Sequence, residues 1–210
     1  MKTIRKSILH VASLVLAFVM AITLADIGTA HIQAQAKTKQ EKAAVLYFSA
    51  TGTTRTAAKR IGKKTKGTVV EIKAADLYTD EDLDYGDDQS RVTKEHESAS
   101  SPANSSVRPK ISNLKAIKKA VKNADVVYIG YPIWWGEAPH IVYTLVENVN
   151  LKGKTVVPFC TSISSGIGSS GANLKTKAKI SAKTNWLAGR NFYDAPSQKT
   201  VNKWINGLKY

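Results

Sequence analysis

The sequence predicts an α/β domain in which a parallel sheet is doubly wound, with helices on both faces. Short runs rich in valine, isoleucine and tyrosine alternate along the chain with segments whose apolar residues recur at helical spacing. The runs are almost continuously apolar, which is typical of parallel strands covered on both sides. A chain of 210 residues is long enough for one such domain, and its composition excludes disordered, collagenous and multi-span membrane proteins.

Five strands and the helices between them can be placed in order. The strands are predicted at residues 43–48, 68–72, 125–130, 155–160 and 184–189. Apolar side chains at helical spacing predict helices that carry, in turn, Ala57, Ala58 and Ile61; Leu114, Ile117 and Val121; Ile141, Leu145 and Val149; and Val201, Trp204, Ile205 and Leu208. The repeated strand–helix order favours a single sheet with helices packed on both sides.

Residues 1–36 are predicted to be a signal peptide. A basic head is followed by an apolar run at residues 8–25, and an Ala-Gln-Ala motif that ends at Ala36 offers a cleavage site. An uncleaved membrane anchor is the alternative, since the run is nearly long enough to span a bilayer. The expected product is a secreted or extracytoplasmic protein, with the cell wall as a candidate location. In it, residues 37–42 form a short linker and residues 43–208 form the domain.

The connection at residues 74–110 is an insertion that interrupts this rhythm. It is polar, and it contains nine of the 16 acidic residues of the chain. Connections of this length are usually functional or disordered. The simplest interpretation is a solvent-exposed acidic segment that Tyr78 and Tyr85 attach to the domain by packing against it. Three aspartates from Asp80 onward begin like a calcium loop, but Tyr85 and Arg91 stand where that loop needs glycine and glutamate. No metal site is therefore predicted.

A candidate phosphate-binding loop follows the first strand. Four hydroxyls and one glycine precede a helix, and the candidate residues are Ser49, Thr51, Gly52, Thr53 and Thr54. Backbone N–H groups and the helix dipole favour an anion at such a position, and hydroxyls can donate hydrogen bonds to it. Helix capping alone would need one of these side chains. The endings typical of P-loops and the GxGxxG pattern are missing, so a phosphate monoester is the expected ligand group.

Two further loops follow the third and fourth strands. The first contains Pro132, Ile133, Trp134, Trp135 and Gly136. Its two adjacent tryptophans and the preceding Tyr131 cannot all enter one core, and a planar aromatic ligand would give them a partner. The second loop is polar and rich in glycine, and its candidate residues are Thr161, Ser162, Ser164, Gly166 and Gly168. Because the carboxyl ends of parallel strands meet at one edge of a sheet, the three loops predict a site for one flat, phosphorylated ligand.

At these loops the sequence resembles the flavodoxin family, and more closely the variant whose flavin loop reads Tyr-Pro-Ile-Trp-Trp-Gly. The resemblance extends over residues 43–208 and implies a five-stranded sheet of order 2-1-3-4-5. It also implies FMN as the cofactor. The loop at 49–54 would then hold the phosphate, and the loops at 132–136 and 161–168 would lie beside the flavin ring. The chemistry would belong to the flavin rather than to a protein acid or base.

No side chain is predicted to be catalytic. Cys160 ends the fourth strand, and low-molecular-weight phosphatases also join a cysteine loop to a related sheet, but residues 161–168 contain no arginine to bind phosphate. A Gly-x-Ser-x-Gly elbow is also missing, so an esterase would lack its nucleophile. We therefore expect Cys160 to be a small buried apolar residue.

The formal net charge of +15 comes mainly from lysine. Nucleic-acid readers usually mix arginine and aromatic residues into their basic patches, so no nucleic-acid partner is expected. Association with an anionic cell wall or membrane surface is the favoured role of this charge. Two functional classes remain: an exported FMN protein that carries electrons or reduces quinone-like acceptors, and a non-redox cell-surface binding module on the same fold.

Overall fold

The computed structural model describes residues 41–210. The predicted signal peptide at residues 1–36 and the linker up to residue 40 lie outside the described residues. Within the described range, no helix is long and apolar enough to cross a membrane.

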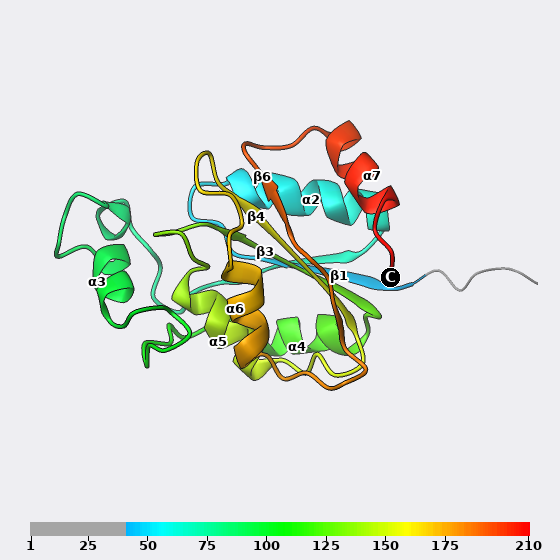
Figure 1. The fold of residues 1–210 in the computed structure, drawn as a ribbon, viewed down its shortest axis with the longest axis horizontal. Helices are drawn as coiled ribbons and strands as arrows, with labels where there is room; N and C mark the ends of the chain where they lie inside the picture. Colours follow the sequence, from blue (N-terminus) through cyan, green and yellow to red (C-terminus); the bar gives the residue numbers. More distant parts are fainter. Residues whose placement is uncertain (1–40) are drawn as a thin grey trace, which may run out of the picture. The chain divides into compact units, whose positions relative to one another are not determined.

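A parallel sheet forms the centre of the domain (Figure 1). Its strands are β1 (Ala43–Tyr47), β2 (Thr68–Glu71), β3 (Val126–Pro132), β4 (Thr155–Thr161) and β5 (Asn185–Trp186), and they pair in the order β2-β1-β3-β4-β5. All but one residue of β3 and all but one of β4 are buried, as expected for central strands covered on both faces. The predicted doubly wound class and the order 2-1-3-4-5 are confirmed.

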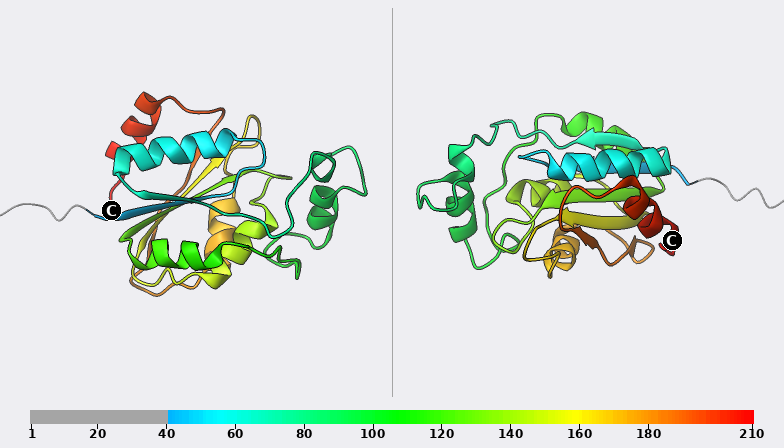
Figure 2. Two further views of the ribbon diagram at one scale, coloured as in Figure 1. Left: turned by 180° about the vertical axis from the view of Figure 1, so that it is seen from behind. Right: turned by 90° about the horizontal axis from the view of Figure 1, so that it is seen from above.

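Helices cover both faces of the sheet (Figure 1 and Figure 2). Helices α2 (Thr53–Thr65) and α7 (Gln198–Asn206) lie on one face, and α4 (Leu114–Lys122), α5 (His140–Asn148) and α6 (Ser170–Lys177) lie on the other. Successive side chains of a strand point to opposite faces, so Leu46 enters the core under α4 and α5 while Val45 enters the core under α2 and α7. The apolar residues predicted for the helices are buried there, apart from Leu114, Trp204 and Leu208, which are half-buried.

The fifth strand is interrupted, which corrects the continuous strand predicted at residues 184–189. A second piece, β6 (Arg190–Phe192), follows β5 and also pairs with β4 in parallel. Three residues separate the two pieces of the fifth strand, opposite two residues of β4. The extra residue makes a β-bulge at the edge of the sheet.

Pro158 in β4 explains the break. The carbonyl of Val156 accepts a hydrogen bond from the N–H of Leu187, so the backbone groups of Val156 face the fifth strand. Residues two apart in a strand face the same neighbour, which means that Pro158 also faces the fifth strand but has no N–H to offer it. Gly189 lies against this point, where a Cβ atom would come within 3.0 Å of the Pro158 carbonyl oxygen.

The insertion at residues 74–110 is folded and extends beyond the carboxyl ends of the strands (Figure 1). It contains a 3-10 turn, η1 (Glu81–Leu83), and a short helix, α3 (Arg91–Glu97), whose N-terminus is capped by the side chain of Ser90. An antiparallel bridge between Ala74 and Ile111 closes its base. Its surface is acidic, but Val92 is only 2% exposed and belongs to the same hydrophobic core as Leu46 and Ile141, so the insertion packs onto the domain.

Gly130 in β3 leaves space for the ring of Phe159 in β4, and this pair yields a stability prediction. A Cβ atom on Gly130 would lie 2.1 Å from Cζ of Phe159, so Gly130→Ala should lower the free energy of unfolding by about 1–3 kcal/mol through overpacking. Urea denaturation measures the loss. Gly171→Ala is the control, since its nearest neighbour would lie at an ordinary 3.5 Å. A Phe159→Leu background should reduce the penalty, and an unchanged penalty there would show that the clash is not its cause.

Candidate functional site

A cavity of about 480 Å³ opens at the ends of β1, β3 and β4. Ten residues that the sequence singled out line it: Thr51, Thr53, Pro132, Ile133, Trp134, Trp135, Gly136, Thr161, Ser162 and Ser164. Five other predicted residues belong to the same loops but not to the lining: Ser49, Gly52, Thr54, Gly166 and Gly168. Four lining residues were not predicted: Tyr85, Ile163, Ser165 and Tyr193. The structure therefore brings the three predicted loops together around one cavity.

The loop between β1 and α2 presents the start of a helix to this cavity. Gly52 immediately precedes α2 with φ of 96°, a left-handed conformation that suits glycine, and its N–H donates to Ser49 Oγ at 3.1 Å. Among the described residues, no side chain caps the N-terminus of α2, and its first turn holds no acidic residue. Thr51 and Thr53 line the cavity next to the first backbone N–H groups of α2. This arrangement can accept an anion.

Thr54 has a different role from its neighbours in the loop. It is 1% exposed, and its hydroxyl shares a 2.7 Å hydrogen bond with the hydroxyl of Thr161 at the end of β4. The bond joins the first loop to the third beneath the cavity. Thr54 therefore positions the two loops, while Thr51 and Thr53 are the hydroxyls that a ligand can reach.

The loop after β3 turns sharply at Trp135 and Gly136. Trp134 and Glu137 exchange two backbone hydrogen bonds of 2.9 Å, and the two residues between them have φ of 51° and 79°. Positive φ at both central positions is the geometry of a type I′ turn, which a tryptophan seldom adopts. Asn173 of α6 donates to Glu137 Oε1 at 2.6 Å and holds the turn from behind. Backbone strain of this kind is often found at ligand sites.

Both tryptophans have aromatic neighbours within the protein, in addition to the planar ligand that the sequence predicts as their partner. Trp134 is 9% exposed and packs edge-to-face against Phe48 and Tyr78, with ring centroids 5.5 and 5.1 Å away. Trp135 is 43% exposed and stacks on His96 at 4.7 Å with an interplanar angle of 7°. Tyr78 and His96 belong to the insertion. Trp134 is thus a core residue, and Trp135 is the ring that remains accessible.

The third loop and the end of the fifth strand form the remaining wall. Ser162 Oγ accepts the N–H of Ser165 at 3.0 Å, and Asn191 Nδ2 donates to the Ser162 carbonyl at 3.1 Å, which ties the loop to β6. Tyr193 follows β6 and is 68% exposed. It was missed because the fifth strand was predicted to end at residue 189, and a strand extended to Phe192 would have placed an aromatic residue at its carboxyl end. Tyr85 does not follow a predicted strand, so no pattern in the local sequence points to it as a cavity residue.

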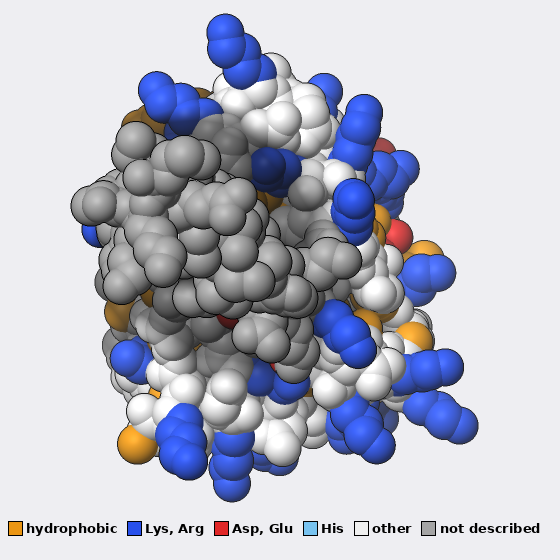
Figure 3. Space-filling model, turned by 90° about the vertical axis from the view of Figure 1, so that its right-hand side faces the viewer, with side chains coloured by type: hydrophobic (Ala, Val, Ile, Leu, Met, Phe, Trp, Pro, Cys, Tyr) orange, Lys and Arg blue, Asp and Glu red, His pale blue; other side chains and the backbone are white. Residues whose placement is uncertain are grey.

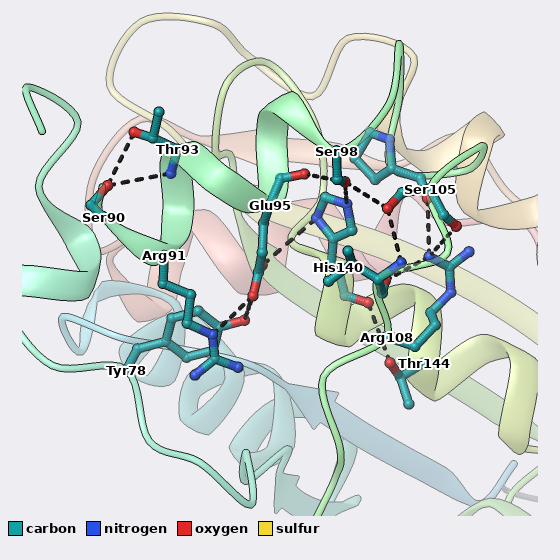
Figure 4. A network of polar contacts seen from close by, with 12 residues as sticks. Tyr78, Ser90, Arg91, Thr93, Glu95, Ser98, Ser105, Arg108, His140 and Thr144 are labelled. Atoms are coloured by element: carbon teal, nitrogen blue, oxygen red, sulfur yellow. Dashed lines mark hydrogen bonds and ion pairs between the residues drawn. The ribbon is translucent and has the colours of Figure 1, made fainter. Parts of the chain in front are cut away.

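A buried polar network connects the insertion to α5 (Figure 4). Glu95 of α3 is 5% exposed and accepts hydrogen bonds from Tyr78 at 2.8 Å and from Arg91 Nε at 3.0 Å. His140 at the start of α5 is 4% exposed, with Nδ1 3.7 Å from Glu95 Oε2. Arg108 pairs with Glu147 of α5 at 2.9 Å on the other side. These contacts fix the insertion to the domain.

Burial dominates the protonation equilibria in this network. Burial raises the pKa of Glu95, although the hydrogen bond from Tyr78 and the charge of Arg91 oppose the rise. Burial also lowers the pKa of His140 to about 4, and the charge of Arg108 acts in the same direction. The imidazole is therefore neutral at neutral pH, and Arg91 supplies the positive charge nearest to Glu95.

Comparisons with known proteins agree with this geometry. The family model described as flavodoxin matches residues 42–208. The chain is similar to the structure of a candidate flavoprotein from Bacteroides eggerthii, with 40% identity, a TM-score of 0.68, and coverage of 79% of this chain and 96% of that one. It is also similar to the structure of a candidate flavoprotein from Bacteroides uniformis, with 37% identity, a TM-score of 0.63, and coverage of 80% of this chain and 99% of that one. A third similar structure is that of a flavoprotein in complex with FMN from Lactobacillus acidophilus, with 20% identity, a TM-score of 0.53, and coverage of 79% of this chain and 99% of that one. No match was found among curated proteins.

The fold and the site define the class of this protein. A doubly wound parallel sheet with one cavity at the carboxyl ends of its central strands is typical of α/β proteins that bind a ligand at that edge. Because the matched region covers nearly all of the described residues, the chain belongs to the flavodoxin family.

The neutral state of His140 yields a prediction for acid stability. We expect the free energy of unfolding to fall as pH drops from 6.5 towards 4, because the unfolded chain binds a proton at this ring and the folded chain does not. The loss from His140 approaches about 3 kcal/mol near pH 4, where the folded ring begins to titrate. Glu95 acts in the opposite direction, because its raised pKa lets the folded state bind a proton first.

A comparison of the wild type with His140→Asn separates the contribution of His140 to the pH dependence of stability from that of Glu95. Urea denaturation from about pH 7 to about pH 4.5 should show a stability difference that narrows as the pH falls, since the variant lacks the ring that titrates. A difference that stays constant over this range would contradict a neutral, buried His140.

Proposed function

We propose that this member of the flavodoxin family is an exported FMN-binding redox protein that carries electrons or reduces a quinone-like acceptor. One observation carries the proposal. The cavity joins an uncapped helix N-terminus, flanked by the hydroxyls of Thr51 and Thr53, to the accessible ring of Trp135. These features suit the two parts of FMN, a phosphate dianion and a planar ring system. The Lactobacillus acidophilus flavoprotein, whose structure contains FMN, supports this choice of cofactor.

The residues of the cavity fit FMN in size and in chemistry. A volume of about 480 Å³ lies within the range of small-molecule sites, about 300–1,000 Å³. Thr51, Thr53 and the first N–H groups of α2 would hold the phosphate, and Trp135 and the loop at 161–165 would flank the ring. Bound FMN would supply one- and two-electron transfer, while these residues bind it, orient it and limit its contact with water.

Apolar side chains around the mouth of the cavity support a small, planar redox partner. Tyr85, Trp135, Ile163 and Tyr193 are 45%, 43%, 86% and 68% exposed, and all four line the cavity. They make up half of the large exposed hydrophobic residues in the described chain, so the concentration at one site is marked. An exposed apolar rim favours contact with an apolar acceptor such as a quinone. Export is proposed from the pattern of residues 1–36.

The phosphate assignment is tested with two ligands that differ only in that group. Replacing Thr51 and Thr53 together by valine should weaken FMN binding strongly, because each hydroxyl donates to a dianion and contributes about 1.5–3 kcal/mol. Riboflavin, which lacks the phosphate, should bind the variant and the wild type almost equally. Quenching of flavin fluorescence on titration of the full chain measures both affinities.

Thr68→Val is the matched control, since Thr68 is an exposed residue at the start of the edge strand β2. Equal losses of FMN and riboflavin in the double variant would remove the phosphate from this loop. A wild type that binds neither flavin would instead favour the non-redox binding module.

Trp134 and Trp135 should respond differently to replacement by leucine. Trp135→Leu should weaken FMN binding by about 1 kcal/mol beyond the effect of lost area and should reduce the quenching of tryptophan fluorescence by FMN. Trp134→Leu should instead lower the free energy of unfolding by about 2–4 kcal/mol, because it opens space in an aromatic cluster. Flavin titration and urea denaturation of both variants give the two readouts. Loss of quenching in the Trp134 variant alone, without destabilisation, would reverse the assignment.

A further inference from the structure

Charge is divided between the two ends of the domain. Nine acidic residues lie in the insertion at 74–110, beyond the carboxyl ends of the strands. A lysine stands within four residues of the start of every strand from β1 to β5: Lys42, Lys66, Lys122, Lys154 and Lys183. Figure 3 views the end at which β1 begins, and many Lys and Arg side chains but few acids stand on the part of it that is described. This basic end faces away from the proposed flavin cavity.

A second cavity, of about 550 Å³, is built into the basic end. It lies between the C-terminal ends of α4 and α5 and the turns that lead into β4 and β5. Five lysines line it: Lys118, Lys122, Lys152, Lys154 and Lys179. Two asparagines and one valine complete the described lining, which includes no acid, no arginine and no aromatic residue.

Backbone hydrogen bonds hold the lysine-bearing turns in place. The N–H of Leu151 donates to the carbonyl of Lys179 at 3.0 Å, which joins the two turns across the cavity. Gly153, with φ of 71°, donates its N–H to Thr184 Oγ1 at 3.1 Å. Lys152 and Lys179 therefore project from a fixed frame, and the frame does not depend on a ligand.

The lysines of this cavity outweigh the negative ends of the two helices. Each helix C-terminus is equivalent to about half a negative charge, so α4 and α5 together offset about one of the five ammonium groups. The ion pairs of Arg55, Arg91, Arg108 and His140 lie elsewhere in the domain and use no lysine of the cavity. The ammonium groups of five lysines around one cavity repel one another, and a bound anion reduces that repulsion.

We propose that this cavity binds a phosphate-rich polyanion, that is, a chain of linked phosphate groups. Lysine ammonium groups are compact point charges that suit phosphate oxygens. The described lining offers no aromatic ring on which a nucleobase could stack, which disfavours single-stranded nucleic acid. The site lies at the opposite end of the sheet from the flavin cavity, so its occupancy does not depend on the proposed function. In an exported protein, this cavity would be the place at which the protein contacts an anionic cell wall.

The test uses sodium tripolyphosphate as the probe and the full chain as the protein. Isothermal titration calorimetry at about 0.1 M salt compares the wild type with two triple variants, because screening at this ionic strength suppresses distant charges. The cavity variant carries Lys122→Gln, Lys152→Gln and Lys179→Gln, all at exposed positions. The control variant carries Lys59→Gln, Lys63→Gln and Lys199→Gln in α2 and α7, also exposed. Lys154 is left unchanged because its ammonium donates to the carbonyl of Ala124.

We expect the cavity variant to bind tripolyphosphate at least about tenfold more weakly than the wild type, and the control variant to bind within about twofold of it. Both variants lose the same charge, so an equal loss in the two would show diffuse attraction and overturn the site. A parallel arm measures sedimentation with phosphatidylglycerol and phosphatidylcholine vesicles. Lysine-dependent binding to phosphatidylglycerol without tripolyphosphate binding would also overturn the proposal and would assign the cavity to lipid headgroups. Flavin titration of both variants serves as a separate readout of the intact first cavity.

Discussion

The candidate site depends above all on the packing of three aromatic rings. Phe48 directly follows β1, Tyr78 belongs to the insertion, and Trp134 belongs to the loop after β3, yet the centroids of their rings lie 5.1–5.5 Å apart. Tyr78 also donates to Glu95, so the same ring carries the attachment of α3. Because Trp134 is buried in this cluster, the tight turn that follows it presents Trp135 to the cavity. The contact that fixes the insertion therefore also fixes the ring at the ligand site.

The sequence predicted the parts of this arrangement that follow from local patterns. Apolar runs located the central strands, and the rule that loops meet at the carboxyl ends of parallel strands gathered Thr51, Trp135 and Ser162 correctly around one cavity. The different roles of Trp134 and Trp135 could not be predicted, because each ring has an aromatic partner, Tyr78 for Trp134 and His96 for Trp135, in a polar insertion without a periodic pattern. The break in the fifth strand depends in turn on Pro158 of its neighbour. Both failures concern contacts between segments distant in sequence.

The net charge of +15 describes neither end of the domain. Acidic residues of α3 and η1 lie near the first cavity, whereas five lysines line the second. A ligand at the first cavity experiences the nearby acids of the insertion more strongly than the distant lysines, since screening limits the reach of exposed charges to about 10 Å at 0.1 M salt. The excess of basic residues therefore acts at the end of the domain where the strands begin. At the other end, local contacts decide the electrostatic potential.

The bulge between β5 and β6 protects the outer edge of the sheet. A long, flat edge strand offers an unbroken row of N–H and C=O groups to a strand from another molecule. Here that row is divided into pieces of two and three residues, and β2 at the opposite edge has only four residues. Neither edge offers a regular template of useful length, so sheet-to-sheet aggregation is disfavoured even at high protein concentration. Pro158, placed inside the sheet, thus makes the neighbouring edge strand a poor template for pairing with another molecule.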